Sequence, residues 1–170
     1  MNIYLAGAFR NRLLIKIARS YLNSFLRESN IKEPKFKFTS SWLDQTTNDN
    51  ITLKSISCMD YSGIDRCDVL VCFFPLAETG GAISEMGYAL GANKKVIYVI
   101  EKGLFPGPEE IIDPKKFNST MPLPVGQLKE FNNVDDLNME EKGFIVHEFT
   151  QLLVCLEYYN KILEDPKSRL

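Results

Sequence analysis

The sequence predicts an α/β fold, a three-layer sandwich in which helices cover both faces of a parallel sheet. Two observations support this. Short, continuous apolar runs, such as Val69 to Phe74, are typical of strands that are buried on both faces. Segments with helical periodicity separate these runs, and the alternation of strand and helix favours parallel pairing. We therefore expect a single domain over residues 1–170 with a five-stranded parallel sheet.

The first half of the chain supplies two of these strands. Asn2 to Gly7 forms the first and ends on glycine, and Phe36 to Thr39 forms a short second strand. A helix is expected from Leu13 to Arg27 between them, and another from Ile51 to Arg66 after a polar loop. The apolar residues of the first helix fall at helical spacing: Leu14, Ile17, Ala18, Tyr21, Leu22 and Phe25.

The stretch from Asp68 to Ile100 reads as strand, glycine-bearing loop, helix and strand. Pro75 ends the strand Val69 to Phe74, since proline has no N–H for the ladder. Glu78-Thr79-Gly80-Gly81 predicts a turn with Thr79 as N-cap. A helix then runs from Ala82 to Asn93, and Lys95 to Ile100 is the next strand.

The alternation of strand and helix becomes less regular after Ile100. Five prolines lie between Gly103 and Gly126, and a loop of this length is usually functional or mobile. Gln127 to Phe131 is expected to be a fifth, edge strand. A long amphipathic helix is predicted from Glu140 to Leu163, with one apolar face formed by Ile145, Phe149, Leu152, Leu156, Tyr159 and Leu163.

Composition excludes several classes of function. With 45% hydrophobic residues, 25% charged residues and a net charge of −2, we expect a globular protein that binds no nucleic acid polymer. No apolar run reaches 18 residues and the chain starts on a strand, so we expect a cytoplasmic protein without a membrane segment. The only histidine, His147, is expected inside the last helix, and three of the four cysteines fall in segments that read as buried. Neither a metal site nor a Ser-His-Asp triad is expected.

No cofactor is expected either. Phe9 stands where a dinucleotide fingerprint needs its second glycine, and no Gly-Lys-Ser/Thr is present. Glu85 is the candidate of most interest, because it falls in the first turn of a helix just past a strand's carboxyl end. Parallel sheets bind ligands there, and the helix dipole favours an ionised carboxylate. The alternative is a helix-capping glutamate.

Four pieces of the chain together resemble the nucleoside 2-deoxyribosyltransferase family and its deoxynucleotide N-glycosidase relatives, which have a flavodoxin-like or Rossmann-like fold. They are I-Y-L-A-G from Ile3, S-x-W-L-D from Ser40, D-x-x-x-I-D-R-x-D-V-L-V from Asp60, and G-G-x-x-x-E-x-G-Y-A-L from Gly80. The resemblance covers about the first hundred residues and does not extend past Gly103.

The resemblance implies the roles of three residues. Glu85 is the nucleophile that attacks C1′ of the deoxyribose, and a base or water then resolves the ester with retention. Asp60 lies near the base and sugar and protonates the leaving base, while Tyr4 positions the nucleophile. The alternatives are a local hydrogen bond for Asp60 and a core position for Tyr4. Asp65 and Asp68 are interpreted as structural.

The expected substrate-binding residues are Gly7, Gly80 and Gly81, whose backbones can approach the sugar, and Trp42, which stacks on the base or belongs to the core. Many transferases of the family carry an aspartate shortly before the nucleophile, where this chain has Glu78 and Thr79, so Thr79 is a further candidate and base preference stays open. Arg10 and Arg12 hold a 5′-phosphate or are solvated surface charges.

Three functions follow. The leading hypothesis is transfer of deoxyribose from a 2′-deoxynucleoside to another base. The second is hydrolysis of deoxynucleoside 5′-monophosphates, and the third is a nucleotide-binding domain without catalysis. The resemblance also implies a homo-oligomer, with sites completed by a neighbouring subunit.

Overall fold

The computed structural model describes residues 1–7, 12–28, 36–44, 53–73, 80–100 and 127–165. Within these ranges six strands form one parallel sheet in the order β2-β1-β3-β4-β6-β5. The expected α/β class and parallel sheet are confirmed, with six strands in place of five. The strands are β1 (Asn2–Gly7), β2 (Lys37–Phe38), β3 (Val69–Phe73), β4 (Lys95–Val99), β5 (Lys129–Glu130) and β6 (Gly143–Val146).

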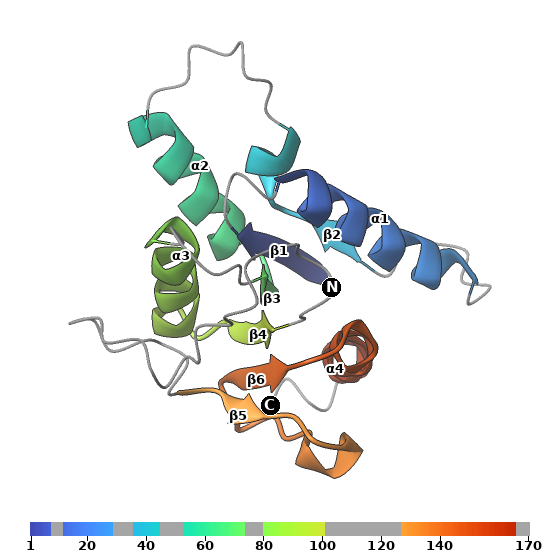
Figure 1. The fold of residues 1–170 in the computed structure, drawn as a ribbon. Helices are drawn as coiled ribbons and strands as arrows, with labels where there is room; N and C mark the ends of the chain where they lie inside the picture. Colours follow the sequence, from blue (N-terminus) through green and yellow to red (C-terminus); the bar gives the residue numbers. More distant parts are fainter. Residues whose placement is uncertain (8–11, 29–35, 45–52, 74–79, 101–126, 166–170) are drawn as a thin grey trace.

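The helices form the outer two layers of the sandwich. Helices α2 (Leu53–Asp65) and α3 (Gly80–Gly91) cover one face of the sheet, and α1 (Arg12–Glu28) and α4 (Phe149–Glu164) cover the other (Figure 1). Two short 3₁₀ helices, η2 (Ser41–Asp44) and η5 (Val134–Asp136), complete the described part. Among the described residues, no helix combines the length and the hydropathy that a membrane span requires.

The winding of the sheet reverses between β1 and β3. Strand β1 pairs with β2 on one side and with β3 on the other. Open α/β sheets bind ligands at the carboxyl ends of the strands where the winding reverses in this way. Gly7 of β1 and Phe73 of β3 are register partners at that edge.

The sixth strand, β6, is a correction to the sequence prediction. Residues 143–146 were expected to belong to the long last helix, because Ile145 continues the apolar stripe of that helix. They instead form a fully buried strand between β4 and β5. A run of four apolar residues is too short to show whether its periodicity is that of a helix or of a strand. Burial on both faces of the sheet identifies it as a strand. The expected edge strand is confirmed as β5.

Helix α4 therefore begins at Phe149, later than the predicted Glu140. The side chain of Gln151 accepts hydrogen bonds from the backbone N–H groups of His147 and Glu148, at 2.7 and 3.1 Å. These bonds satisfy donors at the helix start, which is why the helix does not extend back into β6. His147 consequently lies in the link before α4, with its Nε2 2.8 Å from the Glu130 carboxylate, and not inside the helix as expected.

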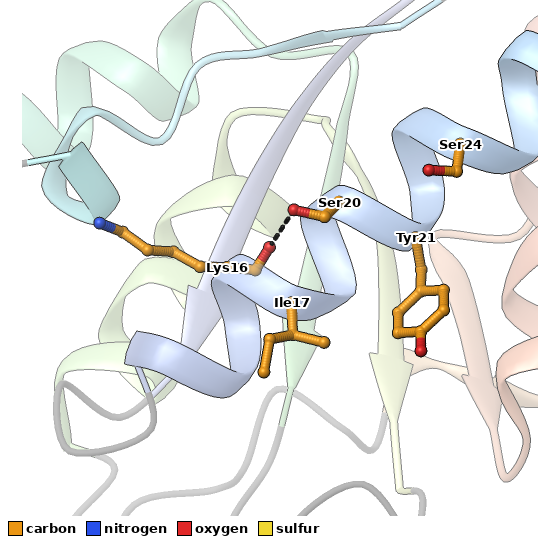
Figure 2. Close-up of a pocket in the computed structure, with 5 residues that line it drawn as sticks. All are labelled: Lys16, Ile17, Ser20, Tyr21 and Ser24. Carbon is orange, nitrogen blue, oxygen red and sulfur yellow. Dashed lines mark hydrogen bonds between the residues drawn. The ribbon is translucent and has the colours of Figure 1, made fainter.

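Helix α1 buries a narrower face than its sequence predicts. Ile15, Ala18 and Leu22 are fully buried, whereas Ile17 and Tyr21, which were expected in the apolar stripe, are 42% and 65% exposed. The predicted stripe is too wide for one helix to bury against β1 and its neighbours. The exposed side forms a shallow hollow lined by Lys16, Ile17, Ser20, Tyr21 and Ser24 (Figure 2).

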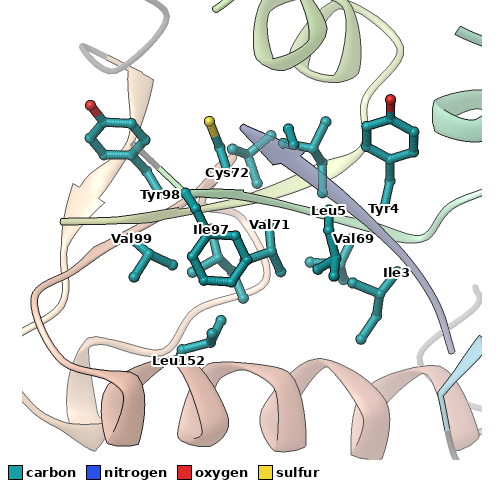
Figure 3. Packing of buried hydrophobic residues seen from close by; sticks show 14 of the residues in the cluster. Ile3, Tyr4, Leu5, Val69, Val71, Cys72, Ile97, Tyr98, Val99 and Leu152 are labelled. Carbon is teal, nitrogen blue, oxygen red and sulfur yellow. The ribbon is translucent and has the colours of Figure 1, made fainter. Parts of the chain in front are cut away.

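The core lies on both faces of the sheet. Ile3, Leu5 and Val71 point toward α4, where Leu152 meets the sheet, while Tyr4 points to the opposite face (Figure 3). The alternation follows from the period of two along a strand. Cys67, Cys72 and Cys155 are buried, as expected for three of the four cysteines.

Candidate active site

Strand β1 presents Tyr4 to the face of the sheet that α2 and α3 cover. The side chain is fully buried, and Cys72 of β3 and Tyr98 of β4 point to the same face (Figure 3). A buried tyrosine hydroxyl needs a polar partner. Tyr4 donates its O–H to Oε1 of Glu85 at 2.8 Å, across 81 residues of sequence. The structure thus brings together two of the predicted site residues.

Glu85 projects from α3 in the second turn of the helix. The sequence prediction placed it in the first turn, but α3 begins at Gly80, two residues before the expected start. The helix dipole acts mainly within the first turn, so its support for an ionised carboxylate is weak here. This corrects the expectation that the dipole keeps Glu85 ionised.

Burial controls the ionisation of Glu85. It raises the pKa of this carboxyl from 4.5 to about 8, and the negative charge of Asp60 adds to the rise, whereas the hydrogen bond from Tyr4 lowers it. In a desolvated site a carboxyl prefers to stay protonated unless a donor compensates its charge. Tyr4 is that donor. Burial raises its own pKa, and the neighbouring carboxyls of Glu85 and Asp60 raise it further.

Asp60 belongs to α2 and is the third member of the cluster. Burial raises the pKa of its carboxyl, and hydrogen bonding with Tyr4 partly opposes that rise. Its Oδ1 atom is buried and has no hydrogen-bond partner among the described residues. A buried oxygen without a partner is costly, so such an atom needs an explanation. The Tyr4 hydroxyl therefore interacts with two carboxyls, one from each helix of this layer.

Two side chains hold β1 in place beside Tyr4, and the sequence did not indicate that they act as a pair. The Ser40 hydroxyl accepts a hydrogen bond from the Leu5 N–H, and the Trp42 indole N–H donates to the Leu5 carbonyl at 2.9 Å. Both the N–H and the carbonyl of Leu5 are therefore hydrogen-bonded by side chains. They have no partner strand on this side, because β2 ends at Phe38. Ser40 and Trp42 are 2% and 6% exposed. In this structure Trp42 packs in the core, and stacking on a base stays a prediction.

The predicted glycines occupy different environments. Gly7 ends β1, and a Cβ there would lie 2.4 Å from Cδ1 of Ile15, so the absence of a side chain lets α1 pack closely on β1. Gly80 opens α3. Gly81 is exposed in the first turn of α3, and a Cβ there would meet nothing within 4 Å. Backbone contact between these glycines and a sugar stays a prediction.

The two arginines are only partly placed. Arg12 begins α1, and its Nε donates to the carbonyl of Leu43 at 2.9 Å, which ties the helix to η2. Arg10 and Thr79 lie outside the described residues, as does the expected loop from Gly103 to Gly126. Phosphate binding by Arg10 and Arg12 stays a prediction.

Asp65 and Asp68 have structural partners, as expected. Asp68 accepts a hydrogen bond from the Asn2 N–H at 2.7 Å, joining the start of β1 to the start of β3. Asp65 accepts from the Tyr88 hydroxyl at 2.9 Å and so links α2 to α3. The bond from Tyr88 to Asp65 therefore joins the two helices that carry Asp60 and Glu85.

Comparison with known proteins gives matches among solved structures alone. No protein-family model and no curated protein matches the chain. A structure of Clostridium botulinum CMP N-glycosidase, BcmB, has a TM-score of 0.42 at 21% identity, covering 59% of this chain and 72% of that chain. A conserved protein from Enterococcus faecalis V583 has a TM-score of 0.44 at 16% identity, covering 100% and 99%.

Proposed function

We propose that the protein cleaves the N-glycosidic bond of 2′-deoxynucleosides and transfers the deoxyribose to another nucleobase. The observation that carries this proposal is the cluster of Glu85, Tyr4 and Asp60, in which one tyrosine hydroxyl interacts with two carboxyls of raised pKa. Double displacement at an anomeric carbon needs two such groups, a nucleophile and an acid–base.

Glu85 is the nucleophile in this proposal. Its ionised Oε attacks C1′ while the C1′–N bond breaks and the electron pair leaves with the base. A deoxyribose lacks the 2′-hydroxyl, so positive charge develops at C1′ more readily and a carboxylate can capture it. The Tyr4 O–H supports the ionised carboxylate before attack.

Asp60 is the acid in the first half of the reaction and the base in the second. Burial raises the pKa of its carboxyl, and in its protonated form Asp60 can give a proton to the departing base nitrogen. A second base then attacks C1′ through nitrogen, the Glu85–C1′ ester breaks, and Asp60 takes up the proton that the incoming base loses. Two inversions give net retention.

A hydrolase of 2′-deoxynucleoside 5′-monophosphates is the second candidate, since it uses the same intermediate with water as acceptor. Arg12 favours it, because this residue starts the helix that follows β1. Guanidinium groups suit phosphate bidentately.

A product assay separates these candidates. The protein is incubated with deoxyinosine, with a deoxynucleoside 5′-monophosphate and with CMP, each with and without free adenine, and products are resolved by chromatography. New deoxyadenosine supports the transferase. Free base from the monophosphate, unchanged by adenine, supports the hydrolase. Cleavage of CMP alone would overturn the 2′-deoxy preference, and binding without turnover would overturn both candidates.

Replacing Tyr4 by phenylalanine tests the support that this hydroxyl gives to Glu85. Because the hydrogen bond lowers the pKa of Glu85, its loss raises that pKa above its present value of about 8. We expect kcat/KM near pH 7 to fall about tenfold, and the acidic limb of the kcat/KM–pH profile to move to higher pH. The loss should shrink when the assay pH is raised to 9.

The control is Tyr159→Phe. Tyr159 is a buried tyrosine of α4, on the other face of the sheet, and its hydroxyl has no partner among the described residues. Removing the same atom there should leave the profile in place. An unmoved acidic limb in Tyr4→Phe would argue against the assigned role of Tyr4.

Arg10→Ala and Arg12→Ala distinguish nucleosides from nucleotides. If these arginines bind a 5′-phosphate, each change should lower kcat/KM about ten- to a hundredfold on the monophosphate and little on the nucleoside. Since Arg12 is engaged by Leu43, and the leading proposal is a nucleoside transferase, we expect small, equal effects on both substrates. Arg66→Ala, at an exposed arginine after α2, is the charge-matched control. A selective loss on the monophosphate would favour the hydrolase.

A further inference from the structure

Helix α2 approaches β1 at a position that has no side chain. Gly63 is buried in α2, three residues after Asp60. A Cβ at Gly63 would lie 2.7 Å from the backbone oxygen of Thr39 and 2.8 and 3.0 Å from Cε2 and Cδ2 of Tyr4. Real Cβ atoms essentially never come that close, so any other residue forces a displacement.

The groups that a Cβ would meet cannot easily move. The Thr39 N–H donates to Ile3 of β1 at 2.9 Å, and the Thr39 oxygen accepts from the Ser41 N–H at 3.0 Å. The Tyr4 ring extends from a central strand and is anchored at its far end by Glu85. A side chain at position 63 would therefore push α2 away from the sheet.

Asp60 moves wherever α2 moves. Residues three apart in a helix lie on the same side, about one turn from each other. The place where Gly63 rests on Tyr4 therefore sets how near the Asp60 carboxyl comes to the Tyr4 hydroxyl and to Glu85. Glycine is a poor helix former, and here its place inside a helix has a packing explanation.

We propose that Gly63 is a positioning residue that sets the separation of Asp60 from the Tyr4–Glu85 pair, an inference that rests on the proposed acid–base role of Asp60. Gly63 itself touches no reacting atom. It allows contact between α2 and the Tyr4 ring, and that contact holds the acid at the distance that the nucleophile requires.

The test compares Gly63→Ala with Gly91→Ala. Gly91 is also a helical glycine, in α3, and a Cβ there would meet nothing within 4 Å. We expect Gly63→Ala to lower kcat about ten- to a hundredfold with KM changed less than about threefold, since a small misplacement of a reacting group has an effect of this size. Gly91→Ala should stay within about twofold in both. Wild-type kcat in a folded Gly63→Ala variant would overturn the inference.

Rescue by a longer acid separates positioning from general damage. Asp60→Glu alone should lower kcat at least tenfold, because its carboxyl extends too far. Added to Gly63→Ala, the same change should raise kcat severalfold above Gly63→Ala alone, because the longer side chain spans the wider gap. Full activity of Asp60→Glu in the otherwise native chain would overturn the inference even if Gly63→Ala fails to fold.

A measurement without substrate keeps this inference separate from the proposed function. Moving Asp60 away weakens its repulsion of Glu85, so the pKa of Glu85, followed by carbon NMR of labelled glutamate, should fall in Gly63→Ala and stay in place in Gly91→Ala. A fall in a protein without glycosidase activity would support the geometry and reject the function. An unchanged pKa in an active protein would reject the geometry.

Discussion

Glu85→Ala is expected to lower kcat by at least about 10³-fold, because the enzyme loses the group that forms the covalent bond to C1′. Tyr4 and Asp60 remain in this variant, but neither takes the place of the carboxylate that α3 presents to the Tyr4 hydroxyl. Rapid-quench or steady-state assays on deoxyinosine measure the loss. Mass spectrometry of denatured wild-type protein should show a deoxyribosyl adduct that Glu85→Ala lacks. Activity within tenfold of wild type would end the case for Glu85.

Glu85→Gln provides the matching control for folding. Since the pKa of Glu85 rises from 4.5 to about 8 in the folded protein, the folded state holds this proton more tightly than the unfolded state. The stabilisation from Glu85 is therefore fully present below pH 4.5, declines as the pH rises, and is lost above about pH 8. Glu85→Gln has no such proton. Its melting temperature should fall less than that of wild type between pH 5 and 8, which thermal unfolding followed by circular dichroism would show.

Much of the sheet could be predicted because its signals are local. The apolar runs of β1, β3 and β4 identify buried strands, and Glu85, Asp60 and Tyr4 follow from motif pieces that lie on separate elements. The resemblance implied that Tyr4 positions Glu85 and that Asp60 lies near the base and sugar. The structure joins Tyr4 to Glu85 by a hydrogen bond of 2.8 Å, and the catalytic roles of the three residues stay predictions.

What could not be predicted depends on tertiary packing. The strand β6 is too short to show a period, and only its place between β4 and β5 makes it a strand. The close approach at Gly63 and the two bonds to Leu5 depend on how α2 and η2 rest on β1. The expectation that the helix dipole keeps Glu85 ionised was wrong for the same reason: burial, together with Tyr4 and Asp60, sets the pKa of this carboxyl.

Asp60→Asn should lower kcat about 10²- to 10⁴-fold on deoxyinosine, the range expected for the loss of a positioned proton donor. The amide keeps the shape of the side chain but cannot give up a proton to the leaving base. It also removes a negative charge beside Glu85, so the pKa of Glu85 falls and the acidic limb of the kcat/KM–pH profile moves to lower pH. This shift is opposite to the one expected for Tyr4→Phe.

A substrate whose leaving base needs no proton tests whether Asp60 acts as an acid. The base of 7-methyl-2′-deoxyguanosine carries a positive charge and leaves as a neutral molecule without a proton. Asp60→Asn should therefore lose less than about tenfold on this substrate while losing at least a hundredfold on deoxyinosine. Glu85→Ala should lose activity equally on both, because each substrate needs the nucleophile. Equal losses of Asp60→Asn on both substrates would mean that Asp60 orients the site and that the proton comes from another donor.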